Sequence, residues 1–599
     1  MSSIAVLPAA ALQVILGHLC SGPNNSSTDV ANARLVCKRW ADISCAAVNA
    51  VTPKSAAVLV NTVGKFKALT HVDLRYMRSI DEPAAASLSN LRGLHSLSLP
   101  GSPCWHKLLL RGAVLQAIAA SCSALTRLDI STATDDLAQQ LHPLQQLRAL
   151  SLSGRITDSG LAQLSSLSQL QQLSLSCCDA ISDAGLDVLT ALPALRALSL
   201  QSCLQLGDAA LALLGQMTQL TALSLSHSCE DASSAGLLSL SSLKQLRVLN
   251  LSAASEGAAP GALARLLAAL PQLTALDVSY CEHVNAAVLQ AIAGLQDLRV
   301  LGLSGASPGS LHSLRCLRAL SKLQQLQMRW IGQLKESHVS FLPHLVSLTA
   351  LDISYCRSLS SSGLQQLQWL PQLQALNMMA VASDDLSCLR ALQQLTGLTV
   401  SLLPPSCKSW QDIAGLTQLQ TLALRRCTIT AAGRRAASSS SSSSATTSAK
   451  DPQEASSSTG TSHAVAEAGL DARCLAALQV LTALDCSGSS VDAAALATLQ
   501  LLPSLQHVCL TRCQGVSNAV LGSLIGCSKL AKLDLRLRGS GCSWSCKGLL
   551  PLLQQQPGLS AVYVSEVPVG LPQCEEGRVV ACSSEQAPLM VARDVGLQV

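Results

Sequence analysis

Cysteine is the commonest side chain in this sequence that could do redox or metal chemistry. The chain has 599 residues, among them 24 cysteines and 12 histidines. Thiols that recur at a fixed interval on a stacked ladder do not converge on the tetrahedral centre that zinc requires. We therefore predict that the recurring cysteines point inward as small, weakly hydrogen-bonding groups, and that the protein binds no metal and no other cofactor. These cysteines are Cys178, Cys203, Cys281, Cys356, Cys427 and Cys513.

The sequence lacks the short motifs that mark common active sites. It contains no G-x-x-x-x-G-K-S/T phosphate loop, no H-E-x-x-H zinc helix and no G-x-S-x-G nucleophile elbow. The histidines are dispersed singly, so each is more typical of a surface or loop residue than of a general base. We expect no enzymatic activity from this chain.

Charge and hydropathy further restrict the classes of partner that this protein could bind. Lysine and arginine number 41 against 36 acidic residues, and this net charge of +5 is too small to favour a nucleic acid as the main ligand. Mean hydropathy is +0.35, but polar residues interrupt every leucine-rich stretch, so we expect no membrane span. The cysteines are scattered without dense clusters, which favours a reducing compartment, the cytoplasm or also the nucleus.

The sequence repeats the phrase L-x-x-L-x-L many times. The strands, loops and helices of these repeats must position any binding residues. Most intervals between the starts of the phrase are 22 to 27 residues. Aromatic residues make up only 2% of the chain, so the core must be built from leucine, alanine and valine. Each unit predicts a short strand, a loop and a helical segment. Stacked units predict an α/β solenoid, with a curved parallel sheet inside and helices outside. The starts are Leu69, Leu94, Leu125, Leu147, Leu170, Leu195, Leu220, Leu246, Leu273, Leu298, Leu323, Leu348, Leu373, Leu395, Leu419, Leu481, Leu505, Leu530 and Leu559.

One long interval, from Leu419 to Leu481, contains a serine-rich stretch. We predict that residues 431–467 are a disordered insertion on a loop, between repeats over 56–430 and repeats over 468–566. Residues 567–599 carry no copy of the phrase and predict a C-terminal cap or a disordered tail.

Two resemblances follow from these residues. The phrase with its inward cysteine resembles the cysteine-containing subclass of leucine-rich repeats. Residues 1–55 lack the repeat, and "LPAAALQVILGHL" from Leu7 with "ARLVCKRWADIS" from Ala33 resembles an F-box. That resemblance implies a small all-α module that docks on a Skp-type adaptor, which links it to a cullin. The implied adaptor-facing residues are Leu7, Pro8, Leu12, Ile15, Leu16 and Leu19, completed by Val36, Cys37 and Trp40. The alternative is a plain helical cap on the first repeat.

Two groups of residues predict where the solenoid binds a protein. Strand side chains alternate, so the third, fifth and seventh positions of the phrase should line an exposed concave face, mostly with Ala, Ser or Gln. Tyr, Trp and Arg dominate protein interfaces, which makes the exceptions informative. The central group is Asp277, Tyr280, Arg329, Trp330, Asp352 and Tyr355, and the C-terminal group is Arg425, Arg426, Arg512, Lys532, Arg536 and Arg538. The basic group would suit an acidic or phosphorylated protein, or be no more than a solvated rim.

The resemblances imply a substrate-recognition adaptor of a Skp-cullin-F-box ubiquitin ligase. The solenoid would hold a protein substrate for ubiquitin transfer, and hence for proteasomal degradation, by proximity. The alternative from another class is an interaction scaffold of a cytoskeletal or ciliary assembly that has no ligase link. A third, an innate-immune or signalling receptor, is disfavoured because the sequence shows no nucleotide-binding motif or kinase domain.

Overall fold

The protein is described by a computed structural model in which the chain forms two compact units. The boundary lies between Cys356 and Arg357, within a stretch where the sequence repeat runs on without a break. The described residues are 50–53, 56–66, 68–75, 77, 80, 82–99, 112–254, 257–381, 385–401, 410–430, 470–536, 544–559, 561–565 and 579–581.

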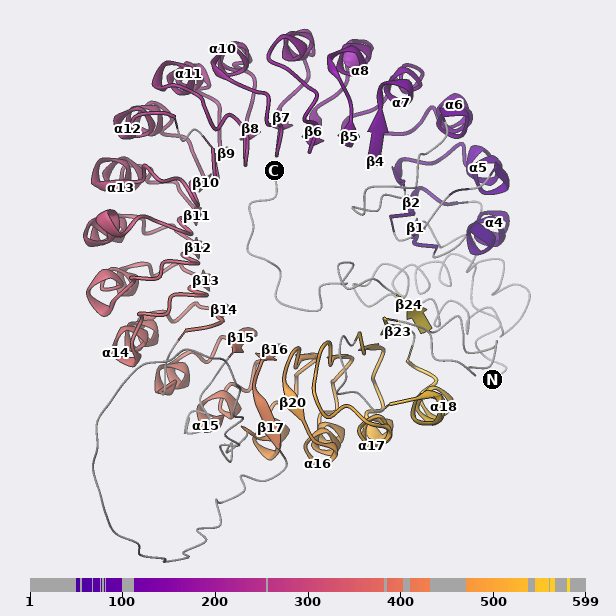
Figure 1. Cartoon of the computed structure of the whole chain (residues 1–599), viewed down its shortest axis with the longest axis vertical. Helices are drawn as coiled ribbons and strands as arrows, with labels where there is room; N and C mark the ends of the chain where they lie inside the picture. The colour runs from indigo at the N-terminus through magenta and orange to yellow at the C-terminus, as the bar shows by residue number, and fades with distance from the viewer. Residues whose placement is uncertain are drawn as a thin grey trace, which may run out of the picture. The chain divides into compact units, whose positions relative to one another are not determined.

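In the first unit each strand pairs in parallel with the next strand along the chain (Figure 1). The predicted parallel sheet of a repeat solenoid is therefore confirmed. The strands are β1 (Ala50–Val51), β2 (His71–Asp73), β3 (Ser96–Ser98), β4 (Arg127–Thr134), β5 (Ala149–Arg155), β6 (Gln172–Ser176), β7 (Ala197–Ser199), β8 (Ala222–Ser224), β9 (Val248–Asn250), β10 (Ala275–Asp277), β11 (Val300–Gly302), β12 (Gln325–Gln327) and β13 (Ala350–Asp352).

The second unit repeats this pattern and adds a small sheet on its loops. β14 (Ala375–Met378), β15 (Gly397–Ser401), β16 (Thr421–Arg425), β19 (Ala483–Asp485), β21 (His507–Cys509), β22 (Lys532–Asp534), β23 (Ala561–Val564) and β24 (Val579–Ala581) pair in parallel in this order. The small sheet places β17 (Thr428–Thr430) between β18 (Leu470–Asp471) and β20 (Ser490–Val491).

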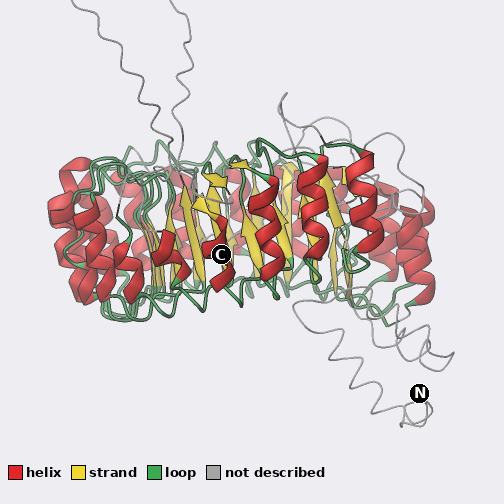
Figure 2. Cartoon of the chain, turned by 90° about the horizontal axis from the view of Figure 1, so that it is seen from below, coloured by secondary structure: helices red, strands yellow, loops and turns green. Residues whose placement is uncertain are grey.

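Helical segments cover one side of the strands in each unit (Figures 1 and 2). In the first unit they are α4 (Ala56–Lys65), α5 (Glu82–Ser89), α6 (Gly112–Ser121), α7 (Asp135–Gln139), α8 (Asp158–Ala162), α9 (Asp187–Thr190), α10 (Asp208–Gln216), α11 (Ser234–Ser239), α12 (Pro260–Ala269) and α13 (Ala286–Ala293), with 3₁₀ turns η2 (Gln163–Ser166), η3 (Ala184–Leu186), η4 (Leu240–Ser242), η5 (Pro308–Ala319), η6 (Glu336–His338) and η7 (Leu342–His344). In the second unit they are α14 (Ser361–Leu364), α15 (Trp410–Ala414), α16 (Ala493–Ala497), α17 (Asn518–Ser523) and α18 (Cys546–Gln555), with η8 (Gln365–Trp369), η9 (Ser387–Ala391), η10 (Ala472–Ala477), η11 (Thr498–Leu501) and η12 (Leu524–Gly526). Among the described residues no helix is long and apolar enough to cross a membrane.

Equivalent residues of neighbouring repeats pair with each other across the sheet. Leu150 pairs with Leu173, which pairs with Leu198 in the next repeat. All three are buried, as are the other leucines of the phrase in these repeats. The core is thus a stack of leucine layers, which is why so few aromatic residues suffice.

The strands on either side of the serine-rich stretch are direct neighbours. β16 pairs with β19 through Leu422 and Leu484, although 62 residues separate these partners. On the loop side, Ile429 of β17 pairs with Leu470 of β18. Residues 431–469 themselves lie outside the described part of the chain, and the pairings around them are those expected for an insertion into one repeat.

Two short strands lie beyond the ends of the recognised repeats. β1 lies inside the segment that we assigned to the N-terminal helical module, and it pairs with β2. β24 lies in the segment predicted to be a cap or a disordered tail, and it pairs with β23. The rest of the N-terminal module, residues 1–49, lies outside the described residues.

The recurring thiols point inward, as the sequence predicts. Cys281 donates a hydrogen bond to the carbonyl oxygen of Leu251 at 3.0 Å, and Cys356 donates to that of Met328 at 3.0 Å. In each case the acceptor is the sixth residue of the preceding repeat. A serine replaces cysteine at this position in two described repeats, where Ser228 donates to the carbonyl oxygen of Leu200 at 2.5 Å and Ser489 donates to that of Leu424 at 2.8 Å. The cysteine is therefore a small internal donor that links neighbouring repeats.

A second link between repeats explains the aspartates that recur at the helix starts. Asp158 accepts hydrogen bonds from the backbone N–H and the hydroxyl of Ser182, at 2.8 and 2.6 Å. Asp135 and Asp208 make the same pair of bonds to Thr157 and Ser233 of the following repeats. A side chain on Gly185 would collide with the Asp158 carboxylate, so the glycine makes room for it.

We predict that Asp158→Ala weakens the stacking between two repeats. It removes two charge-assisted hydrogen bonds and leaves the Ser182 N–H without its acceptor, which costs about 2 kcal/mol. Urea unfolding followed by circular dichroism measures this loss. Asp187→Ala is the control, because Asp187 is an exposed aspartate in the first turn of α9. An equal effect of both substitutions would disprove the role of Asp158.

We also predict that neighbouring cysteines differ sharply in reactivity. Burial raises the pKa of the Cys178 thiol to about 11, whereas Cys177 is exposed. Since the thiolate is the reactive form, Cys178 should resist alkylation at pH 8. Brief labelling of the folded protein with iodoacetamide, followed by peptide mass spectrometry, should modify Cys177 alone of the two. Equal labelling would contradict the buried position of Cys178.

Candidate protein-binding surface

A row of residues with left-handed backbone conformation runs along one edge of the sheet in each unit. From the repeat that begins at Leu170 onward, every described residue at the eighth position of the phrase has a positive φ. These residues are Cys177, Ser202, His227, Ala253, Tyr280, Gly305, Trp330 and Tyr355 in the first unit, and Ala380, Arg426, Gly488 and Arg512 in the second. We call these two sets the eighth-position rows.

The left-handed turn ends each strand while keeping one more hydrogen bond to the next repeat. The N–H of Tyr280 donates to the carbonyl oxygen of Ser304 at 2.7 Å, and the N–H of Trp330 donates to that of Ser354 at 2.9 Å. This conformation costs a residue with a side chain about 1 kcal/mol, so glycine or asparagine would be the cheaper choice. The fold explains the conformation, but it does not explain why large side chains occupy it.

Three aromatic residues of the first unit lie close together in its row. The rings of Trp330 and Tyr355 stack with centroids 3.9 Å apart and planes 5° apart. The ring of Tyr280 lies against Gly305, where an added Cβ would come within 2.6 Å of the Tyr280 Cδ1 atom. Tyr280 is 44% exposed and Trp330 is 49% exposed. The row therefore presents an aromatic surface, formed by Tyr280, Trp330 and Tyr355, in a chain that has few aromatic residues.

The acidic residues predicted to bind a partner here also have structural roles. Asp277 accepts a hydrogen bond from the N–H of Ser279 at 2.9 Å, and Asp352 accepts one from the N–H of Ser354 at 2.9 Å. These bonds satisfy backbone groups where the strands end. The sequence signal for this role is the spacing D-x-S, which recurs in these repeats but which we did not recognise as a cap.

Arg329 and Asp352, which belong to the same two repeats as Trp330 and Tyr355, form an ion pair. The Arg329 Nε atom is 3.6 Å from the Asp352 Oδ2 atom, and the aspartate is buried. Burial raises the pKa of Tyr280, and the nearby Asp277 and Asp352 carboxylates raise it further against the opposing effect of Arg329. The Tyr280 hydroxyl therefore stays protonated at neutral pH and can donate a hydrogen bond.

The serines of the concave face are more buried than the sequence predicts. Ser224, Ser279 and Ser304 are less than 5% exposed, although strand alternation places them on the open side of the sheet. Side chains on adjacent strands lie only about 4.8 Å apart, so their neighbours shield a residue as short as serine. These serines are therefore largely inaccessible to a partner, whereas longer side chains of the eighth-position row, such as Tyr280 and Trp330, are exposed.

The basic residues of the second unit divide into paired and exposed groups. Arg425 is half-buried and pairs with Asp485 at 3.0 Å. Arg536 is only 4% exposed, and its Nε atom donates a hydrogen bond to Asp534 at 2.9 Å. The prediction that Arg536 is part of an exposed binding surface is therefore wrong. Arg426, Arg512 and Lys532 are exposed. Arg538 lies outside the described residues.

The predicted adaptor-binding residues, Leu7 to Trp40, all lie outside the described part of the chain. Their proposed contact with a Skp-type adaptor stays a prediction from sequence.

Comparison with known proteins bears on the repeats alone. A family model described as "Leucine Rich repeat" matches residues 167–189 and 344–367, and the second segment includes Asp352 and Tyr355. The chain contains leucine-rich repeats. No curated protein matches the sequence, and the family match does not extend to the F-box-like segment.

The solved structures that match this chain are distant in sequence. An internalin from Listeria monocytogenes is 21% identical with a TM-score of 0.31, over 53% of this chain and 83% of that one. TLR13 in complex with the RNA ssRNA13 is 19% identical with a TM-score of 0.44, over 86% of this chain and 61% of that one. A leucine-rich repeat protein of Leptospira interrogans is 14% identical with a TM-score of 0.31, over 86% of this chain and 99% of that one.

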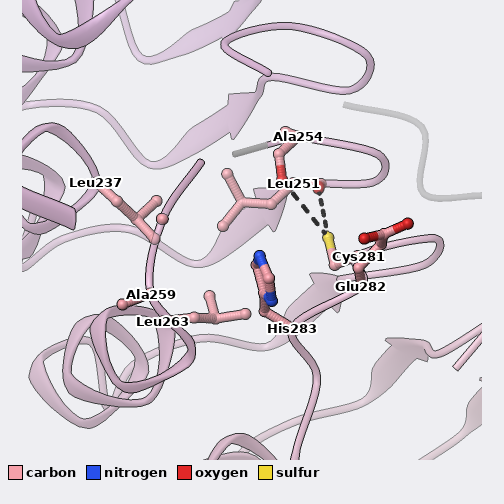
Figure 3. A pocket seen from close by; sticks show the side chains of 9 residues that line it. Leu237, Leu251, Ala254, Ala259, Leu263, Cys281, Glu282 and His283 are labelled. Carbon is pink, nitrogen blue, oxygen red and sulfur yellow. Dashed lines mark hydrogen bonds between the residues drawn. The ribbon is translucent and has the colours of Figure 1, made fainter. Parts of the chain in front are cut away.

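A small hollow between two leucine-rich repeats does not have the features of a ligand site (Figure 3). Its walls are mainly alanine and leucine side chains, such as Ala254, Ala258 and Leu263. The Cys281 thiol at its edge donates to the carbonyl oxygens of Leu251 and Ala254, at 3.0 and 3.9 Å. No group of histidine, cysteine and acidic residues that could hold a metal ion occurs among the described residues.

We predict that the aromatic surface contributes little to folding. Asparagine tolerates the left-handed conformation, so Trp330→Asn exchanges a stacking contact for lower backbone strain and should change the unfolding free energy by less than about 1 kcal/mol. Leu351→Ala, at a fully buried position of the adjacent strand, should cost about 2 to 5 kcal/mol. Denaturant unfolding compares the two. A loss at Trp330 as large as that at Leu351 would make Trp330 a structural residue.

Proposed function

We propose that this chain is a non-catalytic adaptor that binds a protein partner through the aromatic surface of its leucine-rich repeats. The observation that carries the proposal is the choice of residues in the first eighth-position row. Tyr280, Trp330 and Tyr355 occupy backbone positions that disfavour large side chains, and two of them expose nearly half of their surface. Exposed, preordered tyrosine and tryptophan rings are typical binding anchors because they offer large contact area and lose little entropy.

Hydrogen bonds to the polar groups near the rings would fix the orientation of a bound partner. The Tyr280 hydroxyl can donate a hydrogen bond, and the half-buried Asp277 carboxylate is the acidic group on the adjoining strand β10. Arg329 and Asp352 are already paired with each other, so they offer a partner less charge than two separate groups would. Exposed aromatic rings beside charged groups are typical of surfaces that bind a protein segment.

The F-box resemblance of residues 7–40 suggests what this binding is for. We propose that the N-terminal module docks on a Skp-type adaptor and its cullin, so that the bound partner becomes a substrate for ubiquitin transfer and proteasomal degradation in the cytoplasm or nucleus. The alternative is a scaffold with the same protein-binding surface and no ligase link. Only adaptor binding separates the two.

Adaptor binding is tested with a purified Skp-type adaptor and the full chain. We expect the adaptor to co-purify with the wild-type chain and to be lost from Leu16→Asp/Trp40→Ala, because both changes alter the predicted apolar docking surface. Leu204→Asp is the control, since Leu204 is 56% exposed on the solenoid and receives the same charge. Circular dichroism verifies that each variant is folded. A folded wild-type chain that fails to bind the adaptor would leave the scaffold as the function.

The aromatic surface is tested in cells by proximity labelling with the full chain. Proteins enriched by the wild type should fall at least tenfold with Tyr280→Asn/Trp330→Asn and persist with Leu204→Asp. Labelling that is unchanged in the double variant would exclude the aromatic surface as the binding site.

A further inference from the structure

The second eighth-position row carries arginines where the first carries aromatic rings. Arg426 and Arg512 both have left-handed backbone conformation, with φ of 54° and 56°, and both are exposed. Gly488 stands between them in the row, and an added Cβ there would lie 3.3 Å from the Arg426 Cγ atom. The stem of Arg426 therefore extends over Gly488, toward the repeat that carries Arg512.

The acidic residues of this face are already occupied by other arginines. Asp485 pairs with Arg425 at 3.0 Å, and Asp534 pairs with Arg536. Both aspartates are also nearly fully buried, and each accepts a hydrogen bond from the backbone N–H two residues farther along the chain, just after its strand ends. Within the described part of the chain neither Arg426 nor Arg512 forms an ion pair, so their positive charge is available to a ligand.

Lys532 extends this charge along the face. It is exposed on β22, where it pairs in register with His507 of β21, five residues before Arg512. β21 extends only two residues beyond His507, so at roughly 3.3 Å per residue Lys532 lies about 7 Å before the end of the strand, and Arg512 follows three residues after that end. Burial, with a smaller effect of Lys532, lowers the pKa of His507 to about 4, so this histidine is neutral and adds no charge at pH 7.

These positions offer no structural benefit that would explain the charges. Two arginines in left-handed conformation are strained, and several other repeats of the chain use glycine, serine or alanine at this position. Arginine binds carboxylates and phosphates well because its planar group donates two parallel hydrogen bonds. Because Lys532 is separated from Arg512, a ligand with several separated negative charges fits these residues better than one compact phosphate group.

We infer that Arg426, Arg512 and Lys532 form a basic surface that binds an extended acidic segment of a partner protein, rich in glutamate or aspartate. The inference rests on the proposed function, because it assumes that the repeats bind proteins, and it adds the chemistry of the partner at a second surface. The carboxylates of such a segment would engage the two arginines at the strand ends and the lysine farther along the face.

The experiment measures binding of a fluorescent twelve-residue peptide of alternating glutamate and serine to the full chain by anisotropy. The test variant is Arg426→Asn/Arg512→Asn/Lys532→Gln, in which asparagine suits the left-handed positions. The matched control is Arg148→Gln/Arg247→Gln/Arg299→Gln, which removes three exposed cations from the first unit. We expect the test variant to raise Kd at least tenfold, the control less than twofold, and wild-type affinity to fall as salt increases.

Three results would overturn the inference. These are no binding of the glutamate peptide to the wild-type chain, equal weakening by the two triple variants, or tighter binding of an otherwise neutral peptide with a single phosphoserine. The assay uses neither a Skp-type adaptor nor the aromatic surface. Its failure is thus distinguishable from failure of the proposed function, which is read from co-purification and proximity labelling.

Discussion

The structure depends on one constraint, the pairing of equivalent residues between consecutive repeats. Leu150, Leu173 and Leu198 stack because their strands pair without a shift in register. Burial of a leucine side chain contributes about 2 kcal/mol, and a shift of one residue would turn the whole layer toward the opposite face of the sheet. The same register brings together the polar groups that link the repeats.

These polar links satisfy backbone groups where the short strands end and where the helical segments begin. Most strands in the repeats have only three paired residues, so many N–H and C=O groups need partners outside the ladder. The thiol of Cys356 donates a hydrogen bond to the carbonyl oxygen of Met328. The Asp158 carboxylate accepts one from the N–H of Ser182, and the Asp352 carboxylate accepts one from the N–H of Ser354. The cysteine and the strand-end aspartate stand at fixed positions of the repeat, the ninth and the fifth, which explains why their spacing persists.

The same constraint turns single positions into continuous surfaces. Residues at the eighth position lie side by side in successive repeats, so neighbouring large residues such as Trp330 and Tyr355 stack in direct contact. Gly305 and Gly488 interrupt the rows and give space to the side chains of Tyr280 and Arg426. One unit thereby presents aromatic rings and the other presents positive charge. Two chemically distinct surfaces arise from one backbone conformation.

The sequence by itself determined the repeat, the parallel sheet and the inward direction of the cysteines, because each follows from a period that local chemistry repeats many times. It also indicated Tyr280, Trp330 and Tyr355 by their types and positions. Only the tertiary structure decided that Arg536 is buried against Asp534, that Asp277 caps a strand end, and that the serines of the concave face are shielded. These outcomes depend on contacts between repeats and on side-chain crowding. The sequence pattern predicts which residues lie on one face of the sheet. It does not predict which of these residues form ion pairs and hydrogen bonds with each other.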